Sequence, residues 1–496
     1  MKTICNILIL SLLVILENFA IAETTHQETT VNKLSTFKDA LREADPGDVI
    51  IIQNGTYQGW DKVTIAQSGI SGSPITIRAE SPGNVVFRGN DNEFIITGAF
   101  IVLDGLKFQD RNGQDGSAKG VIWLNGAQHS RITNCTFDRI SGPELIYIGR
   151  SGEPHEPDDN RIDHCIFTNN GSRLLHIQNN PDRGQGRRTQ IDHNIFRNNH
   201  YAQGDNLGSL IRVGNWEGYS YFSTGHLIES NTFQDSDTDG DLFHFKASGI
   251  TIRANRFENT NHISFRQGEN HVVEGNLFVN TKESGSGAVR ITGKGGHKVI
   301  NNVFIDGPNS RIAIGLEYGN SDKTLADVHY ITPRNNVIAN NTIYGYDDTG
   351  IYVGTKKGSN STISGKRNDP PRDNTIVNNI IVSTHGTLLR LNGASDNLVS
   401  NNLFHATGAA RVGNPGDNPL YGDPGFQSVA TANFRLLPNS LALDHGIPVP
   451  QVATDFDGHK RPANGAHDIG AFELVDKVQK ELFPPRNVRV ISTLSP

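Results

Sequence analysis

The residues best suited to chemistry in this sequence are an alternating acidic run and the lysine that follows it. The run Asp235-Ser236-Asp237-Thr238-Asp239-Gly240-Asp241 is followed closely by Lys246. Alternating carboxylates suit a calcium loop, because calcium prefers oxygen ligands. The later Glu of an EF-hand is missing, so the run predicts either another kind of calcium loop or an acidic surface turn.

The strands that must hold these residues can be aligned by their alternation of apolar and polar side chains, the period of a half-buried strand. The alternating runs are Leu210–Gly214, Leu242–Lys246, Ile263–Arg266 and Val289–Thr292. Their superposition predicts three rows: Val213, Phe245, Phe265 and Ile291 inside; Gly214, Lys246, Arg266 and Thr292 outside; and Arg212, His244, Ser264 and Arg290 in the neighbouring outer row. Stacked strands lie about 4.8 Å apart, so we expect Lys246 and Arg266 to be close neighbours.

The overall charge limits the partners that such a face can have. The formal net charge is −7, which argues against a nucleic-acid-binding protein with a basic surface. A polyanionic partner would therefore need a local basic patch or a bound cation. The two outer rows predict such a patch, although outward Lys and Arg on a sheet are also ordinary solvated residues. Its members are Arg212, His244, Lys246, Arg266 and Arg290.

A repeated element predicts the architecture that carries these strands. An Asn two residues before a Phe recurs at a spacing of roughly 20 to 40 residues, as in Asn194-Ile195-Phe196, Asn231-Thr232-Phe233 and Asn276-Leu277-Phe278. In a parallel β-solenoid the Asn would stack from coil to coil, hydrogen-bonded at a bend, and the Phe would stack inside. A β-propeller is the alternative, but its repeats are more regular and usually carry Trp.

The N-terminal residues predict an export signal and a cap. Residues 1–22 combine Lys2, an apolar run from Ile7 to Leu16 and the small-x-small site Ala20-Ile21-Ala22. We therefore expect a cleaved signal peptide and a secreted or periplasmic protein without membrane insertion. The amphipathic stretch Thr36–Arg42 predicts a short helix that caps the open N-terminal coil.

The remaining boundaries follow from where the repeat fades. We expect the solenoid over residues 23–412, its C-terminal closing segment over 413–474, and a linker or tail over 475–496. Cys135 and Cys165 occupy equivalent repeat positions. Stacked buried thiols are expected there, with a disulfide as the alternative.

The candidate residues resemble the motif of polysaccharide lyase family 6. The matching elements are Asp239-Gly240-Asp241, Lys246 and Phe265-Arg266-Gln267-Gly268, and the resemblance extends from about residue 100 to 310. The family contains alginate lyases and the dermatan-cleaving chondroitinase B, on right-handed parallel β-helices. The resemblance therefore implies this all-β fold and a lyase domain over the solenoid. Two departures are evident: the family usually has Glu-x-Glu at the acidic pair, and Gln267 replaces a usual His.

The resemblance also implies roles for individual positions. The calcium ligands would be Asn206, Asp239 and Asp241. Lys246 would be the general base, and Arg266 would be the general acid or stabilise charge. The expected substrate-binding residues are Arg212, His244, Gln267, Arg290, His297, Glu317 and Tyr318.

The implied reaction is β-elimination, in which a proton is removed next to a uronate carboxylate. A bound cation would offset the negative charge that builds up there. Lys246 can act as a base only if its pKa falls from about 10.4 towards the operating pH. Because Arg does not readily release a proton, charge stabilisation is the safer role for Arg266.

These inferences predict a secreted, calcium-assisted lyase of an acidic polysaccharide, with alginate as the expected substrate and an unsaturated uronate as the product. The alternatives are a dermatan sulfate lyase, a uronan C5-epimerase that shares the proton abstraction, and a glycan-binding β-helix without catalysis. A glycosidase would need two carboxylates placed across the scissile bond.

Overall fold

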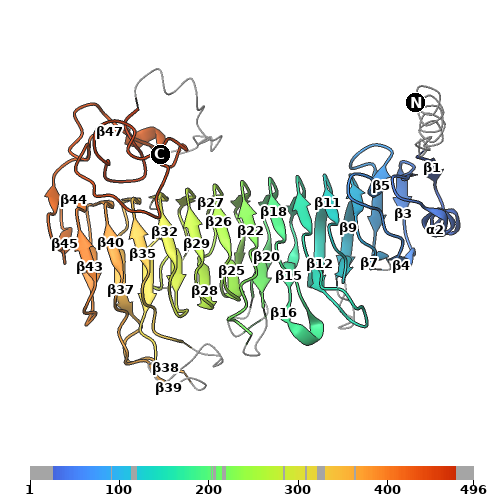
Figure 1. Ribbon diagram of the computed structural model, residues 1–496, viewed down its shortest axis with the longest axis horizontal. Helices are drawn as coiled ribbons and strands as arrows, with labels where there is room; N and C mark the ends of the chain where they lie inside the picture. Colours follow the sequence, from blue (N-terminus) through green and yellow to red (C-terminus); the bar gives the residue numbers. More distant parts are fainter. Residues whose placement is uncertain are drawn as a thin grey trace, which may run out of the picture.

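The computed structural model describes residues 26–475, except 91, 113–119, 203, 205–207, 215–218, 283–284, 306, 308–309, 321–329 and 362–364. Its strands stack into one long, right-handed parallel β-helix, with β1 near one end and β45 near the other (Figure 1). The predicted all-β fold is confirmed. The expected signal peptide and nearly all of the expected tail lie outside the described residues. Within the described part, no helix has the length and apolar character to cross a bilayer.

Each coil contributes strands to three faces, which we call faces I, II and III. Face I contains β1 (Glu28–Val31), β2 (Val49–Ile52), β5 (Ile75–Ala79), β8 (Ile101–Asp104), β11 (Arg131–Thr133), β13 (Arg161–Asp163), β18 (Gln190–Asp192), β22 (Leu227–Glu229), β26 (Thr251–Arg253), β29 (Val272–Glu274), β32 (Lys298–Ile300), β35 (Val337–Ala339), β40 (Thr375–Val377) and β43 (Leu398–Ser400). Face II contains β3 (Gly55–Tyr57), β6 (Val85–Arg88), β9 (Lys107–Asn112), β14 (Ile166–Thr168), β19 (Ile195–Arg197), β23 (Thr232–Gln234), β27 (Arg256–Glu258), β30 (Leu277–Val279), β33 (Val303–Ile305), β36 (Thr342–Tyr344), β41 (Ile380–Ser383), β44 (Leu403–Ala406) and β46 (Leu420–Tyr421). Face III contains β4 (Asp61–Ile65), β7 (Asn92–Ile96), β10 (Ile122–Asn125), β15 (Gly171–Ile177), β21 (Ile211–Val213), β25 (Phe243–Lys246), β28 (Ile263–Gln267), β31 (Val289–Ile291), β34 (Ile312–Glu317), β37 (Thr349–Thr355), β42 (Thr387–Leu391) and β45 (Arg411–Gly413), and the long strand β12 (Thr136–Gly149) runs from face II into face III.

The repeated Asn and Phe stack as predicted. The Phe rings form a continuous interior column, with neighbouring centroids such as Phe196 and Phe233 only 4.5 Å apart and nearly parallel. The Asn side chains form a ladder at the bend between faces I and II. Asn255 shows the pattern: its backbone N–H and its side-chain amide both donate to Asn276 Oδ1, at 3.0 Å each. Every coil thereby satisfies polar groups of the next one, which fixes the register of the stack.

Replacing Asn255 with Ala should destabilise the β-helix strongly. The Asn255 carboxamide accepts from both nitrogens of Asn231 and donates to the Ile228 carbonyl, so its removal leaves several buried groups without partners. Each such group costs about 1–3 kcal/mol. Thermal unfolding followed by circular dichroism should show a clearly lower midpoint, whereas Thr251→Ala on the outside of the same coil should change it little. Equal midpoints for the two variants would contradict a stabilising role of the ladder.

The two cysteines stand at the start of this ladder. Cys135 and Cys165 are buried, and neither forms a disulfide. The Cys165 backbone N–H donates to Asn194 Oδ1 at 2.9 Å, so this thiol occupies a position that Asn holds in later coils. The prediction of buried, unlinked thiols is confirmed.

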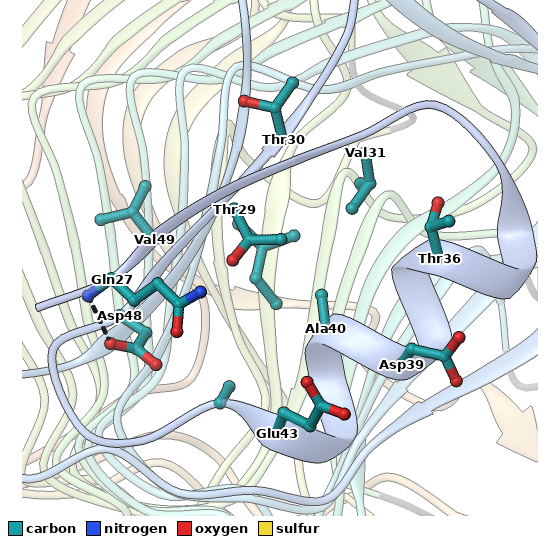
Figure 2. A pocket seen from close by; sticks show the side chains of 12 residues that line it. Gln27, Thr29, Thr30, Val31, Thr36, Asp39, Ala40, Glu43, Asp48 and Val49 are labelled. Carbon is teal, nitrogen blue, oxygen red and sulfur yellow. Dashed lines mark hydrogen bonds between the residues drawn. The ribbon is translucent and has the colours of Figure 1, made fainter.

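The N-terminal end is closed by helix α2 (Leu34–Glu43), which contains the predicted Thr36–Arg42. Its buried Phe37 packs on Trp60 in the first coil, with ring centroids 5.1 Å apart. A hollow of about 280 Å³ lies between this helix and the first strands. Figure 2 shows the residues that line it, among them Val31, Ala40 and Val49. The hollow belongs to the cap, because its lining residues all come from the N-terminal segment, α2 and the first strands.

The C-terminal segment folds back over the outside of the last coils (Figure 1). Phe434 and Phe472 pack on Leu277 and Val303, which are outward residues of face II. The Asn301 side chain also donates to the Thr454 carbonyl at 2.6 Å. The segment therefore closes the β-helix from its side and covers apolar residues that would otherwise meet solvent.

Candidate functional site

Face III brings the predicted inner row and one predicted outer row into register. The inward residues Val213, Phe245, Phe265 and Ile291 are paired in successive strands, and so are the outward residues Arg212, His244, Ser264 and Arg290. The outer row also continues to earlier coils through His176 and Tyr147. Polar and aromatic groups thus line one face over many coils.

The second predicted outer row is wrong at two positions, Arg266 and Thr292. Lys246 pairs with Gln267 and not with Arg266, because the register of β28 shifts after Phe265. Two residues then oppose the single Lys246, which is a β-bulge. The Thr292 hydroxyl lies 2.9 Å from the Phe265 carbonyl oxygen and 3.1 Å from the Arg266 carbonyl oxygen, so it donates to the backbone at the bulge. Thr292 is therefore a buried support of the bulge and not a member of an open row.

A glycine makes this bulge possible. Gly268 has φ +86°, and a Cβ atom there would lie 2.0 Å from the carbonyl oxygen of Ala247. Only Gly tolerates both the left-handed conformation and the close approach. The Phe265-Arg266-Gln267-Gly268 motif therefore positions Arg266 outside the regular ladder.

Lys246 lies on this face with 6% of its surface exposed. Burial, and then the positive charges of Arg212 and Arg266, together lower the pKa of its ammonium to about 7, against a smaller opposing effect of Asp241. A large fraction of Lys246 is therefore the neutral amine near neutral pH. A neutral amine beside two guanidinium groups is suited to removing a proton from an anionic substrate.

Asp241 lies at the centre of a cluster of donors. Its Oδ1 accepts from His262 Nε2 at 2.8 Å and lies 3.5 Å from an Arg290 guanidinium nitrogen. Its Oδ2 accepts from Arg266 Nε at 2.7 Å and lies 3.3 Å from His244 Nδ1. Burial opposes the charge on Asp241, but these partners, above all Arg266, hold its pKa well below its ordinary value. Asp241 is thus an ion-paired carboxylate with four side-chain neighbours.

Asp239 has a different environment. Its Oδ1 accepts from the Gly208 backbone N–H at 2.6 Å. Its Oδ2 is buried and has no hydrogen-bond partner within the described part of the chain. The third predicted calcium ligand, Asn206, lies outside the described residues. One buried oxygen of Asp239 is therefore open to a further ligand, whereas both oxygens of Asp241 already face nitrogen donors.

The predicted residues downstream form a second ion-pair cluster. Glu317 is fully buried and accepts from Arg290 Nε at 2.8 Å and from Arg367. Arg290 and Arg367 hold the pKa of Glu317 below its ordinary value despite burial. The Tyr318 hydroxyl donates to the Asn392 carbonyl at 2.7 Å. Glu317 and Tyr318 therefore support the face through Arg290 and the neighbouring coil.

One predicted residue does not reach the site. His297 is fully buried, stacks on His271 at 4.9 Å between centroids, and accepts a hydrogen bond from the His271 backbone N–H. Burial and the neighbouring His271 lower the pKa of His297 well below its ordinary value. His297 lies between β31 and β32 and is buried in the core, so the structure does not place it on face III, and its role in substrate binding stays a prediction.

The alignment from sequence also missed residues upstream. Glu144 accepts hydrogen bonds from Arg173, at 3.2 Å, and from His176. Burial and the positive charge of Arg173 lower the pKa of Arg212 to about 10. The strands around Tyr147 and His176 have the same alternation as the aligned runs, so extending the alignment by two coils would have found this cluster. Arg367 follows the β38–β39 hairpin (Asn360–Ser361 and Gly365–Lys366), where no repeat signals its position.

Several polar atoms at the centre of the face have no partner within the described residues. They are His244 Nε2, His262 Nδ1, Ser264 Oγ and Gln267 Nε2, and all are buried. Unsatisfied buried polar groups are costly, and their concentration around Lys246 marks a place where a polar ligand would restore hydrogen bonds. The face combines such groups with a base of lowered pKa and several guanidinium groups, which suits an anionic ligand rich in hydroxyls.

Comparison with known proteins gives a family-level match. The model of the family described as chondroitinase B matches residues 31–415, most of the chain. No curated protein matches the sequence significantly.

Solved structures share the fold at low identity. The PL6 family alginate lyase AlyGC has a TM-score of 0.63 and 20% identity, and the match covers 88% of this chain and 60% of that one. A mannuronic acid specific family 6 lyase from human gut microbiota has a TM-score of 0.61 and 21% identity, with coverage of 80% and 91%. The alginate lyase AlyF-OU02, solved as a complex with G6, has a TM-score of 0.60 and 17% identity, with coverage of 91% and 97%. This chain therefore spans only 60% of the length of AlyGC.

Proposed function

The chain belongs to the chondroitinase B family of polysaccharide lyases, and on this basis we propose that it cleaves a uronate-containing acidic polysaccharide by β-elimination, with alginate as its substrate. The observation that carries the proposal is the position of Lys246, whose amine is partly neutral at pH 7 and which lies on the same face of the β-helix as Arg212 and Arg266. The match to polysaccharide lyase family 6 agrees with the motif around Arg266.

In the proposed reaction, Lys246 Nζ accepts the proton from C5 of the uronate. The electrons of the C5–H bond form the C4–C5 double bond, and the bond from C4 to the glycosidic oxygen breaks. The leaving oxygen takes up a proton from solvent, and Lys246 returns its proton to solvent. Each cleavage thus yields one new reducing end and one 4,5-unsaturated uronate.

The guanidinium groups stabilise the charge that this step creates. Arg212 and Arg266 lie close enough to Lys246 to lower its pKa, so they are also placed to offset the charge of a uronate carboxylate bound there. Arg266 is the more exposed of the residues that contact Asp241, which suits a group that meets substrate.

We propose calcium as the cofactor, with Asp239 as its acidic ligand among the described residues. The buried, unpartnered Oδ2 of Asp239 supports this assignment. When bound, calcium supplies positive charge for the uronate carboxylate.

Two substrates are in competition. The alginate lyases among the solved structures support alginate, and the description of the family model supports dermatan sulfate. The apolar run and the small-x-small site within residues 1–22 support export, so the proposed enzyme meets its substrate outside the cytoplasm.

The purified protein should produce a rise in ultraviolet absorbance on alginate, because elimination leaves a conjugated unsaturated uronate. Polymannuronate, polyguluronate and dermatan sulfate should be assayed in parallel, with dextran as a substrate that has no uronate. A rise on dermatan sulfate alone would replace alginate as the substrate. Altered uronate composition without new chain ends would indicate an epimerase, and binding without any product would leave only a glycan-binding role.

A further inference from the structure

The role of Asp241 differs from the calcium-ligand role that its place in the motif implies. A carboxylate offers about four lone-pair positions on its two oxygens. Asp241 has four side-chain neighbours within 3.5 Å, which are Arg266, His262, His244 and Arg290. The Asp241 side chain is only 1% exposed. Each oxygen of Asp241 therefore already faces two nitrogen groups.

A calcium ion on Asp241 would also be placed against positive charge. Calcium needs six to eight oxygen ligands at about 2.3–2.6 Å. Two of the four groups around Asp241 are guanidinium ions, and all four present nitrogen. Asp239, by contrast, keeps one buried oxygen without a partner among the described residues. Asp239 and Asp241 therefore have different environments.

We propose that Asp241 is a positioning residue that holds Arg266 and Arg290 in place across three coils, and that Asp239 alone of the pair is available to a cation. This inference rests on the proposed lyase function. Asp241 precedes β25, Arg266 lies in β28 and Arg290 lies in β31, so one carboxylate ties three successive strands of face III together. The bond from Arg266 Nε leaves the two terminal nitrogens of that guanidinium for substrate, in a fixed orientation.

The length of the side chain explains why this position is Asp. The family usually has Glu here, and the extra methylene moves a carboxylate outward by more than 1 Å. With Glu, the carboxylate would displace the guanidinium that Asp241 contacts at 2.7 Å. Asp is therefore expected in place of Glu at a position where the carboxylate must accept hydrogen bonds from nitrogen donors close to its own backbone.

Asp241→Glu is the decisive variant, because the two roles predict opposite results. If Asp241 is a positioning residue, Asp241→Glu and Asp241→Asn should each lower kcat on alginate about 100-fold, since a misplacement near 1 Å costs that much, with a smaller change in KM. If it is a calcium ligand, Asp241→Glu should keep or raise both activity and calcium affinity, and that result would overturn the proposal.

Calcium binding should be measured by calorimetric titration of the metal-stripped full chain, which requires no activity. We expect wild-type affinity in both Asp241 variants and loss of binding in Asp239→Asn. Asp237→Asn is the matched control, because this residue of the same acidic run pairs with Lys282 and His200. Parallel loss of calcium in the Asp239 and Asp241 variants would refute the separation of roles, and a wild-type chain that binds no calcium would overturn the assignment of Asp239.

Circular dichroism melting of each variant checks that it is folded. If wild-type protein makes no unsaturated product on any uronan, the proposed function fails, but the calcium titration still decides whether Asp241 is a ligand. Free guanidinium should restore part of the lost kcat in Arg266→Ala but not in the double variant that also carries Asp241→Asn. This result would support the positioning role. Equal restoration in both would count against it.

Discussion

Replacing Lys246 with Met should lower kcat on alginate by about 10²–10⁴-fold, the contribution of a general base. Met keeps most of the apolar stem of Lys246 and removes only the amine, so packing on the buried face should survive. The ultraviolet assay of unsaturated product measures the loss. Circular dichroism should show a wild-type spectrum and an unchanged or higher melting midpoint, because burying the ammonium is unfavourable.

Lys294→Met is the matched control for this variant. Lys294 lies on a nearby coil, its side chain is half-exposed, and it pairs with Glu269 at 3.2 Å. Its replacement should leave kcat nearly unchanged. Wild-type activity of Lys246→Met would remove Lys246 from the mechanism, and equal losses in both variants would point to a general effect of charge.

The pH dependence follows from the same residue. The base is the neutral amine, and burial with the repulsion from Arg212 and Arg266 places the pKa of Lys246 at about 7. The value of kcat/KM should therefore rise as pH increases through about 7 and level off above it. An acid limb near pH 10, the ordinary lysine range, would contradict the environment described for Lys246.

The architecture was predictable because it depends on a repeated local signal. Asn231 and Phe233 occur in a short element that returns in coil after coil, and each copy needs the same bend and the same stack. Alternation then assigned Phe245 and Phe265 to the interior without any knowledge of the coil shape. The cap was predictable for a related reason, since the open end of a solenoid requires cover and only Thr36–Arg42 offered an amphipathic helix.

The details of the site were less predictable because they depend on departures from the repeat. The alignment assumed an unbroken register, so it could not foresee the bulge that pairs Lys246 with Gln267. His297 follows a strand of the face, but the chain turns it inward to stack on His271. The four neighbours of Asp241 come from three coils, and no local pattern shows that their side chains converge. Motif resemblance placed Asp241 in the site, and only the contacts show what it does there.

Replacing Arg266 with Ala should lower kcat by about 10²–10³-fold, the usual cost of removing one group that stabilises developing negative charge. The loss should be accompanied by a second effect that a passive residue would not produce. Arg266 is one of the two positive charges that lower the pKa of Lys246. Without the charge of Arg266, the protonated form of Lys246 is less unfavourable. The pKa of Lys246 therefore rises, and the acid limb of the pH profile moves to higher pH.

Arg266→Lys separates these two effects, because Lys keeps the positive charge and lacks the planar fork that Asp241 holds through Nε. Its acid limb should stay near that of the wild type while its kcat remains low. Arg253→Ala is the control, since Arg253 is a half-exposed residue of face I that pairs with Glu229. If Arg266→Ala changes kcat only a few-fold, or if its acid limb does not move, then the guanidinium neither stabilises the reacting charge nor tunes the base. In that case the role of Lys246 must be explained by burial and Arg212 alone.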